Sequence, residues 1–142
     1  MSLNNLMSKD LVTIKMDDTL ATVRDIFDLV SFHHLLVEHE GKLVGIISDR
    51  DFLKAVNTSL GTPLETAKDL VTLNIKAHRI MNRRLVTINE KASVLEVINT
   101  FNQSRKSCLP VVNDDGAAVG IISWKDILNT LAKNMIKKAK GL

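Results

Sequence analysis

The stretch "GKLVGIISDRD", from Gly41 to Asp51, returns later in the chain as "GAAVGIISWKD", from Gly116 to Asp126. In both copies a glycine turn leads into a short apolar run that ends at a serine. This order is typical of a β-hairpin whose second strand runs directly into a helix. The recurrence predicts that one structural unit occurs twice in this chain.

The repeat extends outward from this stretch. Its further matches are "LVTI" at Leu11–Ile14 and Leu85–Ile88, Met7 with Met81, and Phe27 with Phe101. A repeat of this size buries little surface alone, so we expect the two copies to pack face to face with pseudo-twofold symmetry. We assign residues 1–61 to the first repeat, 62–74 to a helical connector, and 75–142 to the second repeat with its basic C-terminal helix.

Each repeat is predicted to follow the order β-α-β-β-α, which is a mixed α/β (α+β) fold. "LVTI" is short and β-rich, as expected of a strand. One face of the helix that follows carries its apolar residues, Leu20, Val23, Phe27 and Val30. The matching helix of the second repeat begins with a capping-box pattern, Ser93 followed by Glu96.

A hairpin is expected next in each repeat. Its apolar runs are Leu35–Val37 and Leu43–Ile47 in the first repeat, and Leu109–Val112 and Val119–Ile122 in the second. Gly41 lies at the first turn, where a glycine is favoured. A second helix should begin after Ser48 and after Ser123, the latter running from about Lys125 to Lys140.

The segments outside the repeats also carry helix signals. In the connector, Gly61 should end one helix, and Thr62, Pro63 and Glu65 should begin another. Shorter approach helices are expected through Leu3–Met7 and Ile75–Met81, ahead of each "LVTI" strand.

Composition narrows the class of protein. The 142 residues are 45% hydrophobic and 25% charged, which is typical of a globular protein, and no apolar run approaches the length of a membrane span. The first residues lack the apolar core of a secretory signal, so we expect a cytoplasmic protein that does not enter the membrane.

Cys108 is the single cysteine, which excludes an internal disulfide, and we expect a buried, inert thiol.

The two serine turns allow two interpretations. Unpaired N–H groups at a helix start can hold a phosphate, and the hydroxyls of Ser48 and Ser123 could add a hydrogen bond. Three residues on, Asp51 and Asp126 could accept bonds from a sugar diol. The cations of Arg50 and Lys125 would suit a phosphate. Ser-x-x-Asp is equally a capping-box signature, which only stabilises a helix start.

The arrangement resembles the CBS domain, which occurs as paired β-α-β-β-α copies, each with a glycine–apolar–apolar–serine/threonine–x–x–aspartate element. The resemblance covers the chain from about Leu3 to Leu131. It implies a CBS-domain pair that binds an adenosine-containing ligand, such as AMP, ADP, ATP or S-adenosylmethionine, in grooves between the repeats. It also implies a regulatory module that forms a homodimer and signals to an unknown effector protein.

The resemblance also implies site residues. The motif serine meets phosphate and the motif aspartate holds the ribose hydroxyls, which assigns these roles to Ser48 with Asp51 and to Ser123 with Asp126. Thr13 and Thr87, in or beside the first strands, together with residues before each hairpin, would line the base pocket. Those residues are His33–Leu35, including His34, in the first repeat, and Ser107–Pro110, including Pro110, in the second.

The chain departs from the family pattern in the first repeat. Leu36 stands where the family often has proline, whereas the second repeat has "LPVV" at Leu109–Val112. Trp124 of the second repeat replaces Asp49 of the first, and we expect its ring to pack on a neighbour. The two sites are therefore expected to differ, and one could be empty.

Catalysis and metal binding find little support in the sequence. The chain has no nucleophile elbow, Walker loop, GxGxxG pattern or paired cysteines, so we expect no enzymatic activity and no required cofactor. His33 and His34 are adjacent and would point to opposite faces of a strand, so we expect no metal site.

The last helix supports two alternative functions. Its apolar residues are Ile127, Leu128, Leu131, Met135 and Ile136, and its lysines are Lys133, Lys137, Lys138 and Lys140. The apolar stripe suits a dimer interface or a partner protein, which favours a dimerisation scaffold that binds no ligand. The lysines, part of a net charge of +3, suit a nucleic-acid-associated protein, although a solvated helix face explains them as well.

Overall fold

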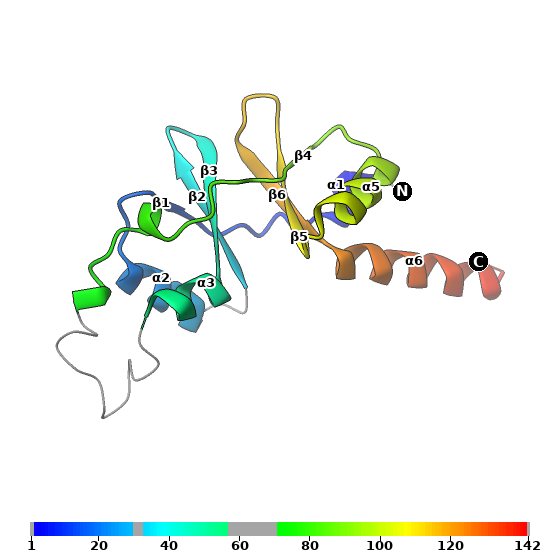
Figure 1. Ribbon diagram of the computed structural model, residues 1–142. Coiled ribbons are helices and arrows are strands. Elements are labelled where there is room, and N and C mark those ends of the chain that lie inside the picture. Colours follow the sequence, from blue (N-terminus) through cyan, green and yellow to red (C-terminus); the bar gives the residue numbers. More distant parts are fainter. Residues whose placement is uncertain (1, 30–32, 57–70, 142) are drawn as a thin grey trace. The chain divides into compact units, whose positions relative to one another are not determined.

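The computed structural model describes residues 2–29, 33–56 and 71–141, which form two compact units (Figure 1). We call Val12–Leu85 the first-repeat unit, and Met1–Leu11 together with Val86–Leu142 the second-repeat unit. The elements of the first-repeat unit are β1 (Thr13–Lys15), α2 (Leu20–Leu29), β2 (His34–His39), β3 (Lys42–Ser48), α3 (Asp49–Ala55) and the 3-10 helix η1 (Ala77–Arg79). Those of the second-repeat unit are α1 (Leu3–Leu6), β4 (Ile88–Asn89), α5 (Val94–Ser104), β5 (Cys108–Val112), β6 (Ala118–Ser123) and α6 (Trp124–Ala139).

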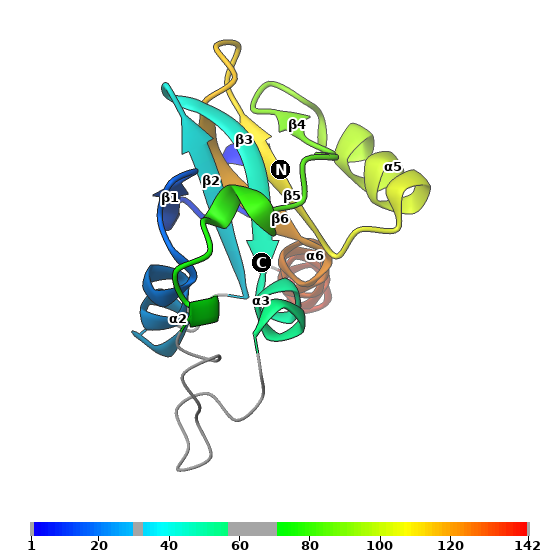
Figure 2. The ribbon, with the colours of Figure 1, turned by 60° about the vertical axis from the view of Figure 1, so that its left-hand side comes forward.

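Both units contain the predicted β-α-β-β-α order. In each, the first strand pairs in parallel with the second, and the second pairs antiparallel with the third, giving sheets β1-β2-β3 and β4-β5-β6. Figure 1 shows α2 and α3 at the end of the β2–β3 hairpin that is opposite its turn. Figure 2 shows α5 beside β4, with α6 continuing from the end of β6. The predicted fold class is confirmed.

The first strands begin later than predicted. The expected strands were Leu11–Ile14 and Leu85–Ile88, whereas the ladders cover Thr13–Lys15 and Ile88–Asn89. The apolar pattern starts where the chain becomes extended. Pairing starts only where the second strand lies alongside, at Thr13 beside Leu36.

A separate apolar core supports each unit. Leu35, Val37 and Ile47 face α2 and α3 in the first-repeat unit, because alternate strand residues point to the same face of a sheet. Leu20 and Val23 of α2 join them, as the predicted helical face requires, whereas Val30 lies outside the described residues. The matching core of the second-repeat unit contains Leu3, Leu6, Ile88, Val97, Phe101, Leu109, Val111, Ile122 and Ile127.

The approach segments are exchanged between the repeats. Residues 1–11 belong to the compact unit of the second repeat, and residues 75–85 belong to that of the first. Ser8 forms a bridge to Ile121 on β6, and Asn82 forms the equivalent bridge to Ile46 on β3. Each segment thereby covers the free edge of a three-stranded sheet. The compact units therefore differ in their bounds from the repeats in the sequence.

The exchange explains the glycine of the repeated motif. A methyl group on Gly45 would collide with Sδ of Met81 and lie 2.8 Å from its Cγ. A methyl group on Gly120 would lie 2.9 Å from Cγ of Met7 and 3.1 Å from the carbonyl oxygen of Ser8. These two glycines therefore permit the approach segment to lie directly against the third strand. The matched methionines in the sequence mark this contact.

A tight turn and two short helices lie close to where the sequence predicts them. Gly41 lies at the first hairpin turn with φ +77°, next to Glu40 with φ +49°, which fits a tight two-residue turn. Short helices occur near both predicted approach segments, at α1 and η1. The helix signals at Gly61, Thr62, Pro63 and Glu65 fall outside the described residues. In the part of the chain that the structure describes, no helix has the length and apolar character needed to cross a bilayer.

Candidate functional site

The turn from β3 into α3 holds Ser48 and Asp51 in direct contact. Oγ of Ser48 accepts a hydrogen bond from the backbone N–H of Asp51 at 3.0 Å. In return, Oδ2 of Asp51 accepts one from the backbone N–H of Ser48 at 2.9 Å. The pair thus forms a complete capping box at a partly buried position.

The turn from β6 into α6 repeats this geometry. Oγ of Ser123 accepts from the N–H of Asp126 at 3.2 Å, and Oδ2 of Asp126 accepts from the N–H of Ser123 at 2.8 Å. A third capping box, Ser93 with Glu96, begins α5, as predicted. Capping therefore accounts for part of what each serine and aspartate does, without excluding a second role.

Each of the two Ser–Asp turns keeps unused hydrogen-bonding capacity. A serine hydroxyl that accepts a bond can still donate its own hydrogen, for example to a phosphate oxygen. Only Oδ2 of each aspartate is engaged with described residues, which leaves Oδ1 of Asp51 and of Asp126 able to accept from a hydroxyl. One turn can therefore offer a donor and an acceptor to a ligand without breaking its cap.

His34 lies across the hairpin from Ser48. The two residues are directly paired in the antiparallel ladder of β2 and β3, so their side chains share one face of the sheet. Burial lowers the pKa of His34 from its ordinary value, and the nearby charge of His33 lowers it further. The carboxylates of Asp49 and Asp51 oppose this shift without reversing it. Burial therefore favours the neutral form of His34.

His33 occupies a different environment from its neighbour. Its Nδ1 lies 3.0 Å from Oδ2 of Asp49, at an exposed position, and its carbonyl oxygen accepts a hydrogen bond from the N–H of Asp49. This contact keeps the pKa of the Asp49 carboxyl below its ordinary value. The sequence alone did not reveal this pair, because the two residues are brought together by the hairpin.

The second-repeat unit has different side chains at the same places. Cys108 pairs with Ser123 as His34 pairs with Ser48. Cys108 is half-buried and not fully buried as expected, and burial raises the pKa of its thiol to about 11, which disfavours the reactive thiolate. Trp124 packs on Phe101, with ring centroids 4.7 Å apart, which confirms that its ring packs on a neighbour.

The remaining predicted residues lie near these turns. Thr13 is level with Leu36 on β2, two residues beyond His34. Thr87 directly precedes β4, which places it level with Pro110. Arg50 and Lys125 are exposed in the first turns of α3 and α6, and neither forms an ion pair with a described residue.

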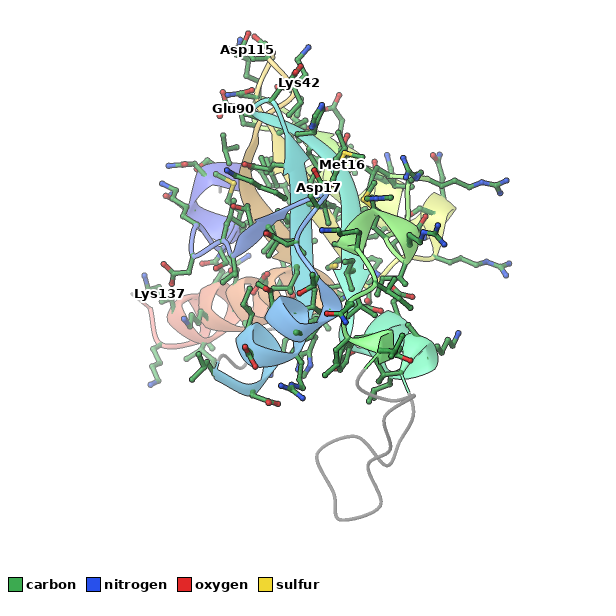
Figure 3. The ribbon with its side chains drawn as sticks, turned by 90° about the vertical axis from the view of Figure 1, so that its left-hand side faces the viewer. Met16, Asp17, Lys42, Glu90, Asp115 and Lys137 are labelled. Carbon is green, nitrogen blue, oxygen red and sulfur yellow. The ribbon has the colours of Figure 1, made fainter. Side chains whose placement is uncertain are left out.

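A cleft also occurs within each unit. The cleft of the first-repeat unit, about 600 Å³, extends from Thr13 along β1 to the hairpin turn and includes Met16 and Asp17, which Figure 3 labels. That of the second-repeat unit, about 570 Å³, lies between Thr87 and α5. Neither cleft is lined by the serine or aspartate of its turn. Among the described residues, no three His, Cys, Asp or Glu side chains converge as metal ligands would.

The exposed face of α6 is a second candidate surface. Leu128, Met135 and Ile136 are exposed by 61%, 71% and 54%, whereas Ile127 is buried in the core of its unit. Lys137, labelled in Figure 3, lies near the end of the same helix. The helix is thus apolar on a side that the second-repeat unit does not cover.

Comparison with known proteins settles the family. The CBS domain model matches the chain twice, over residues 3–58 and 77–133. The chain belongs to the CBS domain family. The match includes both Ser–Asp turns, which are therefore parts of two successive CBS domains.

Individual CBS proteins resemble the chain over most of its length. A CBS domain-containing protein of Dictyostelium discoideum is 34% identical over 130 residues, covering 90% of this chain and 89% of the relative. A CBS domain pair solved in complex with 5′-methylthioadenosine and S-adenosyl-L-methionine is 26% identical, with a TM-score of 0.73 and coverage of 94% and 98%. The ATP-bound cytosolic domain of the Mg²⁺ channel MgtE is 22% identical, with a TM-score of 0.73, and is covered to 48%.

Other relatives are much longer than this chain. Three of them carry the names of enzymes, and the chain spans only 24%, 22% and 11% of their lengths. The similarity covers a minor part of each of these proteins. It therefore assigns no reaction to this chain.

Proposed function

We propose that this CBS pair is a regulatory module that binds an adenosine-containing ligand at its Ser–Asp turns. AMP, ADP, ATP and S-adenosylmethionine are the ligands of this class to be tested. The observation that carries the proposal is that, among the described residues, Oδ1 of each aspartate has no hydrogen-bond partner, while each serine Oγ accepts one bond and keeps its own hydrogen to donate. A helix cap needs neither group, whereas a nucleotide can use both.

The proposed contacts follow from the chemistry of these groups. The hydroxyl of Ser48 or Ser123 donates to a phosphate oxygen. Oδ1 of Asp51 or Asp126 accepts from the ribose hydroxyls, since an ionised carboxylate is an acceptor only. A ligand without a ribose diol would lose the second contact. The carboxylate thus favours a nucleoside over a free phosphate.

Known complexes of similar proteins support this ligand class. The CBS pair with 26% identity was solved with 5′-methylthioadenosine and S-adenosyl-L-methionine, and the MgtE cytosolic domain was solved with ATP. All three ligands contain adenosine. They differ in charge and in phosphate content, which leaves the choice among them to the residues around each turn.

Signalling requires that the ligand distinguish two conformations of the module. A ligand shifts a conformational equilibrium only by its difference in affinity for the two states. In this proposal an effector protein binds one of the states, and the ligand changes how much of that state is present. The effector protein is the part of the mechanism to be identified biochemically.

Thermal unfolding with a panel of ligands tests the proposal. A ligand at about 100 times its dissociation constant should stabilise the protein by ~2.7 kcal/mol, a shift of several degrees in Tm. Asp51→Ala or Asp126→Ala should remove the stabilisation at the altered turn. Glu96→Ala is the matched control, because it breaks a capping box of the same geometry away from both turns.

The outcome distinguishes ligand binding at the Ser–Asp turns from helix capping alone. A selective shift that survives Glu96→Ala but is lost in an aspartate variant supports ligand binding. If no ligand shifts the Tm at millimolar concentration, the Ser–Asp pairs act only as helix caps, and the proposal is wrong.

A dimerisation scaffold is a second candidate function, favoured by the exposed apolar side chains of α6. Leu128 and Met135 would be covered by a second copy of the chain. Met135→Glu should then shift the sedimentation coefficient from that of a dimer to that of a monomer. A wild-type monomer at all concentrations tested would remove this candidate.

A further inference from the structure

The two Ser–Asp turns differ in whether a titratable base lies beside the serine. His34 is the residue paired with Ser48 in the first-repeat unit. Cys108 takes that place beside Ser123 in the second-repeat unit. The flanking residues differ as well, since the Asp49 that contacts His33 is replaced by Trp124. One turn therefore has an imidazole beside its serine that can take up a proton, whereas the other has a thiol in that place.

The hairpin register places the side chains of His34 and Ser48 opposite each other on one face of the sheet. Directly opposed residues of an antiparallel pair have their Cβ atoms roughly 4.5–5.5 Å apart on one face of the sheet. A phosphate that accepts from Oγ of Ser48 would thus lie within a few ångströms of the ring. At such a distance an imidazolium would attract the phosphate strongly.

The charges around His34 help to set its pKa in the absence of ligand. The ionisable groups that act on it are His33, from its own chain segment, and Asp49 and Asp51, from the first turn of α3. The residue directly paired with it, Ser48 on β3, carries no charge. Burial outweighs the two carboxylates, so the pKa of His34 stays below its ordinary value. A bound phosphate would add negative charge and raise it.

We propose that His34 couples phosphate binding at the first-repeat turn to proton uptake, so that this turn selects an adenosine phosphate and binds it more tightly as the pH falls. The second-repeat turn, with Cys108 in the matching position, binds without this proton dependence. This inference rests on the function proposed above. It adds that the two sites differ in ligand preference and that one of them senses pH.

The sign of the effect follows from linkage. Because bound phosphate raises the pKa of His34, the complex holds more protons than the empty protein, and affinity increases as the pH falls. The increase in affinity begins as the pH falls below the pKa of His34 in the complex. It is complete below the pKa of His34 in the empty protein. One histidine can change the affinity by at most about tenfold per pH unit. S-adenosylmethionine has no phosphate and should not show the gain.

Calorimetric titration with AMP at about pH 7.5 and about pH 6 tests the inference. Asp126→Ala silences the second-repeat turn, so that the first-repeat turn is measured alone. We expect its affinity to rise about three- to tenfold at the lower pH relative to the same protein carrying His34→Gln. The comparison with His34→Gln removes the titration of the AMP phosphate itself, which is the same in both proteins.

Proton uptake provides an independent measurement. Titrations in two buffers of different ionisation enthalpy should show that up to one proton is taken up per AMP, and that His34→Gln abolishes the uptake. His39→Gln is the matched control, because His39 lies at the other end of β2, where it pairs with Lys42 and not with Ser48. In the reciprocal protein, Asp51→Ala, AMP binding should take up no proton, and Cys108→His should introduce an uptake there.

The two proposals fail in different ways. Binding of AMP with the same pH dependence in the presence and absence of His34 would overturn this inference and leave the proposed function standing. A lack of binding by any nucleotide at either pH would overturn both. Circular dichroism and the Tm of the unliganded variants establish that each is folded before titration.

Discussion

Replacement of Gly45 by alanine tests the packing that the repeated motif makes possible. The added methyl group would collide with Sδ of Met81 and lie 2.8 Å and 3.0 Å from its Cγ and Cβ. Met81 is 7% exposed, so its side chain has little free space into which to move. Overpacking of this kind costs ~1–3 kcal/mol. The unfolded Gly45→Ala variant has a lower conformational entropy than the unfolded wild type, which offsets about 0.4–1 kcal/mol of this cost.

We therefore expect Gly45→Ala to lower the free energy of unfolding by about 1–2 kcal/mol. Urea denaturation followed by circular dichroism measures this change. The same substitution should cost much less in a Met81→Ala protein, because Sδ and Cγ are then absent and only the contact with Cβ at 3.0 Å remains. The coupling energy of this double-mutant cycle should be about 1–2 kcal/mol.

Gly41→Ala is the control for backbone effects. Gly41 has φ +77° and no atom within 4 Å of a built methyl group, so its replacement costs strain alone. That cost should be the same with and without Met81→Ala. The reasoning is refuted if Gly45→Ala is equally destabilising in both backgrounds, since the collision with Met81 would then not be its cause.

Two further predictions concern the second-repeat unit. With its pKa raised from 9.0 to about 11, Cys108 should react with a thiol reagent at pH 8 about a hundredfold more slowly in the native protein than in urea, and equal rates would contradict this. Trp124→Ala should lower the free energy of unfolding by about 2 kcal/mol through loss of contact with Phe101, whereas Trp124→Phe should retain most of it. Urea denaturation distinguishes the two variants, and equal losses would show that the ring contact contributes nothing.

Much of the secondary structure could be predicted because its causes are local. The face that includes Leu20 and Val23 required only the helical period, and α2 buries both residues. The capping box of Ser93 with Glu96 required only a spacing of three residues, and it begins α5 as expected. The first strands were misplaced because their limits depend on pairing with β2 and β5, which are distant in sequence.

The candidate site could be predicted in part. The spacing of Ser48 and Asp51 indicated that the two side chains meet at a helix start, and they do. The spacing could not show that Oδ2 of Asp51 serves the cap while Oδ1 has no partner in the part of the chain that the structure describes. Nor could it reveal that His33 contacts Asp49, because that contact depends on how the hairpin returns the chain to α3.

The amino-acid sequence by itself determined the number of repeats, their β-α-β-β-α order and the family, because periodicity, turns and duplication are written in consecutive residues. Only the tertiary structure decided that residues 1–11 complete the second-repeat unit and that residues near Met81 complete the first. It also decided which side chain lies beside each serine, His34 or Cys108. The reason is physical: sheet edges and strand registers are satisfied by whichever segment fits against them in space, at any distance along the chain.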